Sequence, residues 1–294
     1  MKNTKPKVRL WSVLTGLTAI LTVAAIVGNI IANQYATTLN VALNASTYKI
    51  IHGENTGDTE YFKKGFASDE EREAYEAELC ATVEAEGAAL LKNENNALPL
   101  ANGAKVSLFG HGSVDLMYGG TGSGSVDTSK APNLKQALEA QGITINQTLW
   151  DLYSSDSMMS KYSRMTPASI SDTLEANTQY AVNEAPWSAL SSAESSFAEY
   201  GDAAIVVLSR SGGEGADLPS GENGTSDNWI SGQEGDGNYL ALSAEEIELL
   251  QNLKALKDNG TFKKIVVLIN SSNAIELDFL NPEICGEDYG IDAA

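Results

Sequence analysis

The chain has 294 residues, of which 43% are apolar and 7 are proline, so it can bury a substantial core in one or two domains and is not a disordered polypeptide. Its formal net charge of −20 excludes a nucleic-acid partner, because phosphate binding requires clustered Lys and Arg. An uncharged partner such as a sugar is compatible with this charge.

The first predicted element is an apolar segment from Leu10 to Ala32 without a charged residue. At about 1.5 Å per residue, a helix of this length crosses a hydrocarbon core about 30 Å thick. The basic residues Lys2, Lys5, Lys7 and Arg9 precede it. They predict a single-pass anchor of the cell membrane, with residues 1–9 in the cytoplasm and everything after Asn33 outside the cell. A cleaved signal peptide is the alternative, although its apolar region is usually only about 7 to 15 residues long.

Residues 33–67 are rich in Asn, Thr and Gly and show little periodicity, so we expect a stalk between the membrane and a globular domain. A helix is predicted to begin at Ser68, where Ser68 and Glu71 form a capping box. Its apolar positions fall on one face, which predicts that the helix packs on the globular body. These positions are Tyr75, Leu79, Val83 and Leu91.

Further along the chain, short apolar strands alternate with helices. Strands are predicted at 105–110, 143–145, 203–208 and 264–270, and helices at 133–140, over most of 167–200, and at 243–256. This alternation predicts an α/β fold, a three-layer sandwich with a mostly parallel sheet that occupies residues 68–294. Ligands bind beyond the carboxyl ends of such strands, so we expect the site in the loops after Leu108, Leu208 and Ile269.

Neither a nucleotide cofactor nor a metal ion is predicted. The first of these loops is rich in glycine, but Asp115 stands where a dinucleotide fingerprint needs its third glycine, and the Lys of a P-loop is missing. The glycines either let backbone amides approach a ligand or make a flexible loop. Cys80 and Cys285 form no CxxC pair and have no His cluster beside them, so we expect two buried free thiols.

Two pairs of acidic residues follow the predicted strand 203–208. Glu214 and Asp217 lie among glycines in SRSGGEGADLP, and Glu234 and Asp236 follow in QEGD. In such a loop the pKa of a carboxylate depends on what closes over it. By composition alone these groups are either solvated surface residues or catalytic ones.

Four motifs occur in a characteristic order: ALLKNENNALPL at 89–100, VSLFG at 106–110 with GGTGSGSV at 119–126, AIVVLSRSGGEGAD at 204–217 and KIVVLINSSNAIEL at 264–277. In this order they resemble the α/β sandwich domain of family 3 glycoside hydrolases, the β-glucosidases and related exo-acting enzymes, over residues 73–294. A barrel usually precedes this domain. Because a membrane anchor precedes it here, the chain resembles the permuted arrangement, in which the barrel follows. Residues 291–294 would begin a further strand, so the sheet is expected to be incomplete at its C-terminal end.

The resemblance implies a retaining mechanism, with an Asp nucleophile from the barrel and a Glu general acid/base from a sandwich loop. Glu214 matches the glutamate of the family's S-G-E-G-x-D-R loop, with Leu218 where Arg is usual, and we favour it as the acid/base. Glu234 is the alternative, since with Asp236 it resembles the E-G-D-R sequence of some relatives, Gly237 replacing Arg. Substrate contacts are expected from Asp217, Gly120, Gly122 and Ser123.

No nucleophile is predicted within the chain. The nearest match to the family's Ser-Asp-Trp is SDNW at 226–229, which has an inserted Asn and no strand before it. Two classes of function remain open. The chain is part of an extracytoplasmic β-glucosidase-like enzyme and inactive without its barrel, or it is a non-catalytic, membrane-anchored module for carbohydrate binding or assembly. The gene sequence beyond Ala294 would distinguish them.

The predicted topology can be tested with protease added outside intact cells. A tag fused after residue 294 should be lost, because the basic residues keep only the N-terminus in the cytoplasm, and a tag before residue 1 should persist. Immunoblots of both tags report the outcome. Loss of the N-terminal tag with protection of the C-terminal one would mean that the orientation is reversed.

Overall fold

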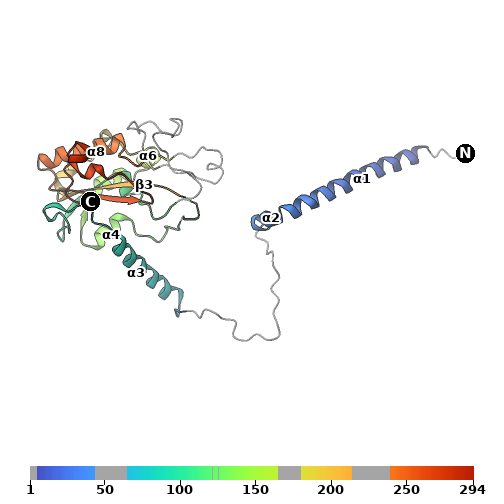
Figure 1. Ribbon diagram of the computed structural model, residues 1–294, viewed down its shortest axis with the longest axis horizontal. Coiled ribbons are helices and arrows are strands. Elements are labelled where there is room, and N and C mark those ends of the chain that lie inside the picture. Colours follow the sequence, from blue (N-terminus) through green and yellow to red (C-terminus); the bar gives the residue numbers. More distant parts are fainter. Residues whose placement is uncertain (1–4, 44–64, 121, 125, 165–179, 214–238) are drawn as a thin grey trace. The chain divides into compact units, whose positions relative to one another are not determined.

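The computed structural model of the chain describes residues 5–43, 65–120, 122–124, 126–164, 180–213 and 239–294 (Figure 1). The chain divides into two compact units, Met1–Thr82 and Val83–Ala294, which are described separately. The first contains helices α1 (Lys5–Gln34) and α2 (Ala36–Ala42), and α3 (Asp69–Gly87) begins in it.

Helix α1 contains one segment, Val8–Gln34, that is long and apolar enough to cross a membrane, with a mean hydropathy of 2.1. Its apolar side chains are exposed. This agrees with the apolar helix predicted at 10–32. A signal sequence near the N-terminus passes the same test of length and composition, so membrane anchoring and topology stay predictions.

Helix α3 begins where the sequence predicts. The N–H of Glu71 donates to Ser68 Oγ (3.2 Å), and the Glu71 carboxylate accepts from the N–H of Ala67 (2.8 Å). The helix ends at Gly87, so Leu91 of the predicted apolar face lies beyond it. Within the helix, Tyr75, Leu79 and Val83 are exposed. That this face packs on the globular body stays a prediction.

The second unit is built on a parallel sheet with the strand order β2-β1-β3-β4, which confirms the predicted α/β fold. The strands are β1 (Lys105–Phe109), β2 (Thr144–Ile145), β3 (Ala203–Arg210) and β4 (Ile265–Ser271). In its register, Val106 pairs with Ala203 and Ala204 pairs with Ile265. Every residue of β3 is buried, because this strand lies inside the sheet and both of its faces are covered.

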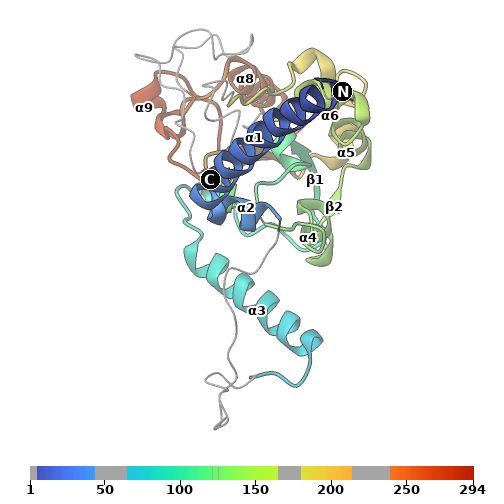
Figure 2. The ribbon, with the colours of Figure 1, turned by 90° about the vertical axis from the view of Figure 1, so that its right-hand side faces the viewer.

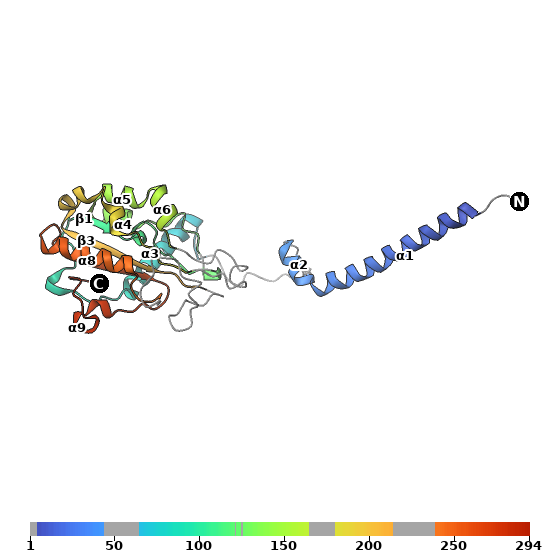
Figure 3. The ribbon, with the colours of Figure 1, turned by 90° about the horizontal axis from the view of Figure 1, so that it is seen from above.

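Helices α4 (Leu134–Ala140) and α5 (Gln147–Tyr153) lie beside β2 and β1 (Figure 2). The remaining described helices of this unit are α6 (Asp156–Tyr162), α8 (Ala244–Asp258) and the single turn α9 (Pro282–Cys285). Helix α8 packs on the sheet (Figure 3). It begins with a capping box, in which Ser243 Oγ accepts from the N–H of Glu246 (3.2 Å) and the Glu246 carboxylate accepts from the N–H of Ser243 (2.9 Å).

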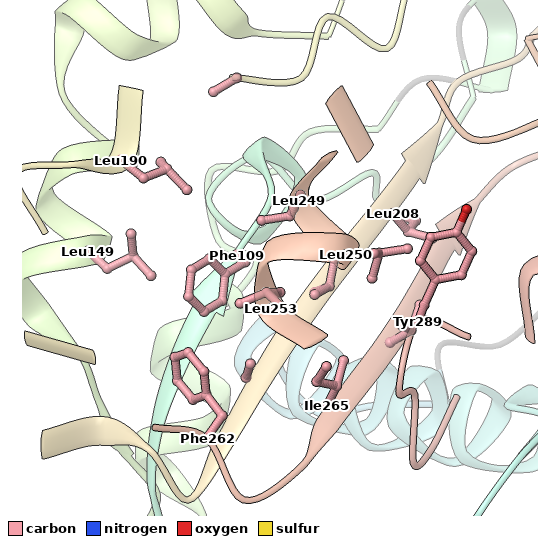
Figure 4. Packing of buried hydrophobic residues seen from close by; sticks show 14 of the residues in the cluster. Phe109, Leu149, Leu190, Leu208, Leu249, Leu250, Leu253, Phe262, Ile265 and Tyr289 are labelled. Atoms are coloured by element: carbon pink, nitrogen blue, oxygen red, sulfur yellow. The ribbon is translucent and has the colours of Figure 1, made fainter. Parts of the chain in front are cut away.

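Two apolar clusters cover the two faces of the sheet. Successive strand residues point to opposite faces, so β1 contributes Phe109 to one cluster and Leu108 to the other. Figure 4 shows Phe109 packed toward Leu249 and Leu253 of α8. The opposite cluster packs residues 97–100 and α4 against the sheet. Burying one such large side chain contributes about 1.5–3 kcal/mol, so the two clusters fix the strand register and the place where each strand ends.

The helix predicted over 167–200 is not seen in the part that the structure describes, residues 180–200. That part forms two 3₁₀ segments, Trp187–Leu190 and Glu194–Tyr200, with backbone bonds such as Ala193 N–H to Leu190 O (2.9 Å). Five serines lie between residues 188 and 196. Serine competes for backbone hydrogen bonds, which explains why a regular α-helix does not form here.

Both cysteines are free, but the prediction that they are buried is wrong. Cys80 is exposed and Cys285 is partly buried. Cys80 lies on α3, none of whose described residues is buried, whereas Cys285 packs against the edge of the apolar core and its Sγ donates to the carbonyl of Glu287 (3.1 Å).

Residues 291–294 lie along the outer edge of β4, as predicted for the beginning of a further strand. Ala293 pairs in parallel with Val266, and its carbonyl oxygen accepts from the N–H of Val267 (2.8 Å). On the other side, Ala293 forms an antiparallel bridge with Asn93.

Candidate active site

The loops after β1, β3 and β4 meet at one edge of the sheet, because the carboxyl ends of parallel strands lie on the same side. They approach one another most closely at glycines. A methyl group added at Gly120 would lie 3.1 Å from the carbonyl oxygen of Gly212 and 3.8 Å from Cα of Gly213. The N–H of Gly212 donates to Ser272 Oγ (2.8 Å), just after β4. The glycines therefore allow backbone to pack closely on backbone here.

Asn270 attaches the loop after β1 to the end of β4. Its Oδ1 accepts from the N–H of Met117 (2.6 Å), and its Nδ2 donates to the Met117 carbonyl (3.0 Å). One side chain thus satisfies both polar groups of a loop residue that has no strand neighbour.

Arg164 joins the same loop to the end of β3. Its Nη1 donates to the Asp115 carbonyl and to Ser209 Oγ, both at 2.9 Å, and its Nη2 lies 3.1 Å from the Asp115 carboxylate. The Arg164 side chain is 12% exposed and that of Asp115 is 33% exposed. The carboxylate therefore keeps part of its surface accessible while its charge is paired.

A cavity of about 500 Å³ lies at this edge and is lined by Asp115, Tyr118, Gly120, Arg164, Ser211 and their neighbours. The paired charges of Asp115 and Arg164 offer both acceptors and donors. The Tyr118 hydroxyl donates to the carbonyl of Pro132 (2.8 Å), and burial, with the nearby Asp115 charge, raises the pKa of Tyr118. Hydrogen-bonding groups of both kinds beside an aromatic ring suit an uncharged molecule with several hydroxyl groups.

Arg210 is fully buried at the end of β3. Its Nη1 and Nη2 donate to the two carboxylate oxygens of Glu246 (2.8 and 2.7 Å). The remaining N–H groups donate to the carbonyls of Ser209, Tyr239 and Ala241, so all five are used. Burial opposes the charge, but the Glu246 carboxylate outweighs it and raises the pKa of Arg210. The end of β3, the start of α8 and the chain at residues 239–241 are thereby held together.

Tyr239 joins the residues on either side of segment 214–238. Its hydroxyl accepts from the N–H of Ser211 (2.8 Å) and donates to the Ser211 carbonyl (3.1 Å). Burial raises the pKa of Tyr239 to about 12, so the hydroxyl keeps its proton at neutral pH and can donate.

The structure describes three of the predicted site residues. Gly120 lines the cavity, whereas Gly122 and Ser123 belong to an exposed 3₁₀ turn, Gly122–Gly124, outside the cavity lining. Glu214, Asp217 and Glu234 lie outside the described residues, as does SDNW at 226–229.

Sequence reasoning did not identify Asp115, Asn270, Arg164 and Tyr239 as site residues. Asp115 and Asn270 stand at the ends of predicted strands, which is the one signal that could have found them. Arg164 and Tyr239 carry no comparable signal, because their partners Ser209 and Ser211 are 45 and 28 residues away.

Residues 88–286 match the C-terminal domain of glycosyl hydrolase family 3. This match covers more than half of the chain, so the chain belongs to glycosyl hydrolase family 3 through its C-terminal domain. The resemblance seen in the sequence motifs is thereby confirmed.

Similar proteins are β-glucosidases. β-Glucosidase A of Butyrivibrio fibrisolvens is 34% identical over 146 residues, 48% of this chain and 15% of the relative. A β-glucosidase of Ruminococcus albus is 29% identical over 205 residues, 69% and 18% of the two chains. A solved β-glucosidase from Paenibacillus barengoltzii has a TM-score of 0.51 and 25% identity, covering 74% of this chain and 20% of that one. The chain thus spans a fifth or less of the length of these relatives.

The buried ion pair can be tested against a matched exposed pair on the same helix. Glu246→Ala should lower the free energy of unfolding by about 3–5 kcal/mol, because it leaves the Arg210 charge buried and unpaired. Asp258→Ala removes a partner of Lys254 at the same N–O distance of 2.7 Å, but Asp258 is 62% exposed, and the loss should be under about 1 kcal/mol. Denaturant unfolding measures both. Similar losses would contradict the importance assigned to the buried pair.

Proposed function

We propose that this chain supplies the general acid/base of an extracytoplasmic, exo-acting, retaining β-glucosidase-like enzyme, anchored to the cell membrane by α1. In this proposal the nucleophile comes from a barrel domain. The observation that carries the proposal is the family match over residues 88–286, which includes the polar cavity at the point where segment 214–238 begins. The proposed ligand is a terminal β-linked sugar, whose hydroxyls the Asp115 and Arg164 side chains can bond.

The proposed reaction has two displacements. In the first, the Glu214 carboxylic acid gives its proton to the glycosidic oxygen while the barrel Asp bonds to the anomeric carbon. The bond between the anomeric carbon and the glycosidic oxygen breaks, the alcohol leaves, and a glycosyl-enzyme ester remains. In the second, the Glu214 carboxylate takes a proton from water, the water oxygen bonds to the anomeric carbon, and the ester bond breaks. The nucleophile and the protonated Glu214 are regenerated. The two carboxyl groups need to be about 5 Å apart.

The described residues beside segment 214–238 favour Glu214 over Glu234. Glu214 directly follows Gly213, whose Cα packs near Gly120, and Ser211 lines the cavity. This place in the sequence, directly after residues that line or adjoin the cavity, supports Glu214. Of the proposed substrate contacts, Asp217, Gly120, Gly122 and Ser123, the cavity lining supports Gly120.

In the full-length enzyme, Glu214→Gln should lower kcat/KM for glucosides with poor leaving groups by about 100-fold or more, the size of a general-acid contribution. Substrates with activated leaving groups need no proton, so the glycosyl-enzyme should still form and accumulate. Added azide should restore its turnover, because an anion attacks without a general base. Steady-state rates with both substrates, with and without azide, give the answer.

Glu234→Gln is the matched control and should retain most of the activity. If Glu234→Gln instead shows azide rescue and Glu214→Gln does not, the acid/base is Glu234. If the full-length protein hydrolyses no glucoside but binds carbohydrate, the non-catalytic module is the correct alternative. The isolated chain should be inactive, because nothing stabilises the developing positive charge at the anomeric carbon.

A further inference from the structure

Two consecutive residues before segment 214–238 are each held by a hydroxyl group that binds both of their backbone polar groups. Tyr239 Oη does this for Ser211, as described above. Ser272 Oγ does it for Gly212, accepting from its N–H (2.8 Å) and donating to its carbonyl (3.3 Å). Backbone that leaves a strand normally loses such partners, so these hydroxyls continue the restraint of β3 past its last residue.

Tyr239 is itself fixed on two sides. Its carbonyl accepts from Arg210 Nε (2.8 Å), and its ring lies 5.7 Å from the Arg210 guanidinium and 5.7 Å from the Tyr180 ring. The residue is 1% exposed. A phenylalanine would fill almost the same space, so packing does not account for the hydroxyl. Its described partner is the Ser211 backbone, three residues before Glu214.

We propose that the hydroxyls of Tyr239 and Ser272 are positioning groups for the acid/base, an inference that rests on the proposed function of Glu214. They fix the peptide units of Ser211 and Gly212, from which the chain continues to Glu214. Proton transfer to a leaving oxygen requires heavy-atom distances of about 2.6–3.2 Å, and a displacement of about 1 Å can cost about 100-fold in rate. A hydroxyl that touches no substrate thereby affects the step that needs the acid.

The test compares Tyr239→Phe with Tyr180→Phe in the full-length enzyme. Both variants remove one hydroxyl from a buried, mutually packed tyrosine, but the Tyr180 hydroxyl has no hydrogen-bond partner within the described residues. The quantity measured is kcat/KM for a glucoside with a poor leaving group divided by kcat/KM for one with an activated leaving group. This ratio does not depend on the fraction of enzyme that is folded, so simple destabilisation leaves it unchanged.

Tyr239→Phe should lower this ratio about tenfold, a part of the roughly 100-fold to 10,000-fold that a general acid supplies. Tyr180→Phe should leave it at the wild-type value. Ser272→Ala should also lower the ratio. It provides the test if the Tyr239→Phe variant does not fold. An unchanged ratio in both Tyr239→Phe and Ser272→Ala would overturn the inference.

Glu214→Gln, measured in parallel, distinguishes a failure of the positioning inference from a failure of the role proposed for Glu214. If it lowers the ratio and the hydroxyl variants do not, Glu214 is the acid and the positioning inference alone is wrong. If it leaves the ratio unchanged, the proposed role of Glu214 is wrong, and the positioning inference falls with it.

Discussion

The charge of Arg210 is buried at the carboxyl end of β3, and this constrains the whole site edge. A buried guanidinium costs several kcal/mol unless it is paired and its donors are satisfied. Glu246 supplies the opposite charge, and the carbonyls of Ser209, Tyr239 and Ala241 accept the remaining N–H groups. Such a pair need not add net stability. What it imposes is geometry, since the end of β3, the start of α8 and the chain after segment 214–238 have to meet at one point.

Elsewhere along this edge, polar side chains also form hydrogen bonds with the backbone of loop residues, and glycines allow the loops to pack closely. Asn270 holds Met117, Arg164 holds Asp115, and Ser272 holds Gly212. The Asn270 and Ser272 contacts each join the ends of two strands, and Arg164 also binds Ser209 Oγ and so links the loop after β1 to β3. The cavity lies among loops that are restrained from outside it, which leaves Asp115 and Tyr118 partly accessible to a ligand. Loops that are restrained in this way can hold a catalytic group in a fixed geometry relative to its substrate.

Features that depend on local sequence could be predicted. Strands β1, β3 and β4 are short apolar runs in the sequence, of which β3 is buried along its whole length. The Ser243 cap of α8 involves residues only three apart. The end of β3 could not be predicted, because Ser209 and Arg210 look like the start of a polar loop. The charge of Arg210 is paired by Glu246, which is 36 residues away. The capping contact of Glu246 is local, but its pairing with Arg210 depends on tertiary structure.

The candidate site also combines features that depend on local sequence with features that depend on tertiary structure. Glycines after the predicted strands indicated the edge of the sheet where the cavity lies, and the motifs indicated the family that the match over residues 88–286 confirms. Arg164 and Tyr239 were not predicted as site residues, because no motif in the neighbouring sequence indicates their contacts with Ser209 and Ser211. For α3, periodicity identifies the apolar face that carries Leu79 and Val83, but it does not identify the surface that would cover that face.

In the proposed function, this edge of the sheet presents Glu214 to the leaving group of the substrate. A crystal structure of the full-length enzyme bound to a slow substrate analogue tests it most directly, through the distance between the Glu214 carboxyl group and the carboxyl group of the barrel nucleophile. We expect the two carboxyl groups to lie about 5 Å apart, with the glycosidic oxygen beside Glu214 and with Tyr239 Oη hydrogen-bonded to the Ser211 backbone. A separation of about 9 Å or more, or Glu234 in that place, would contradict it.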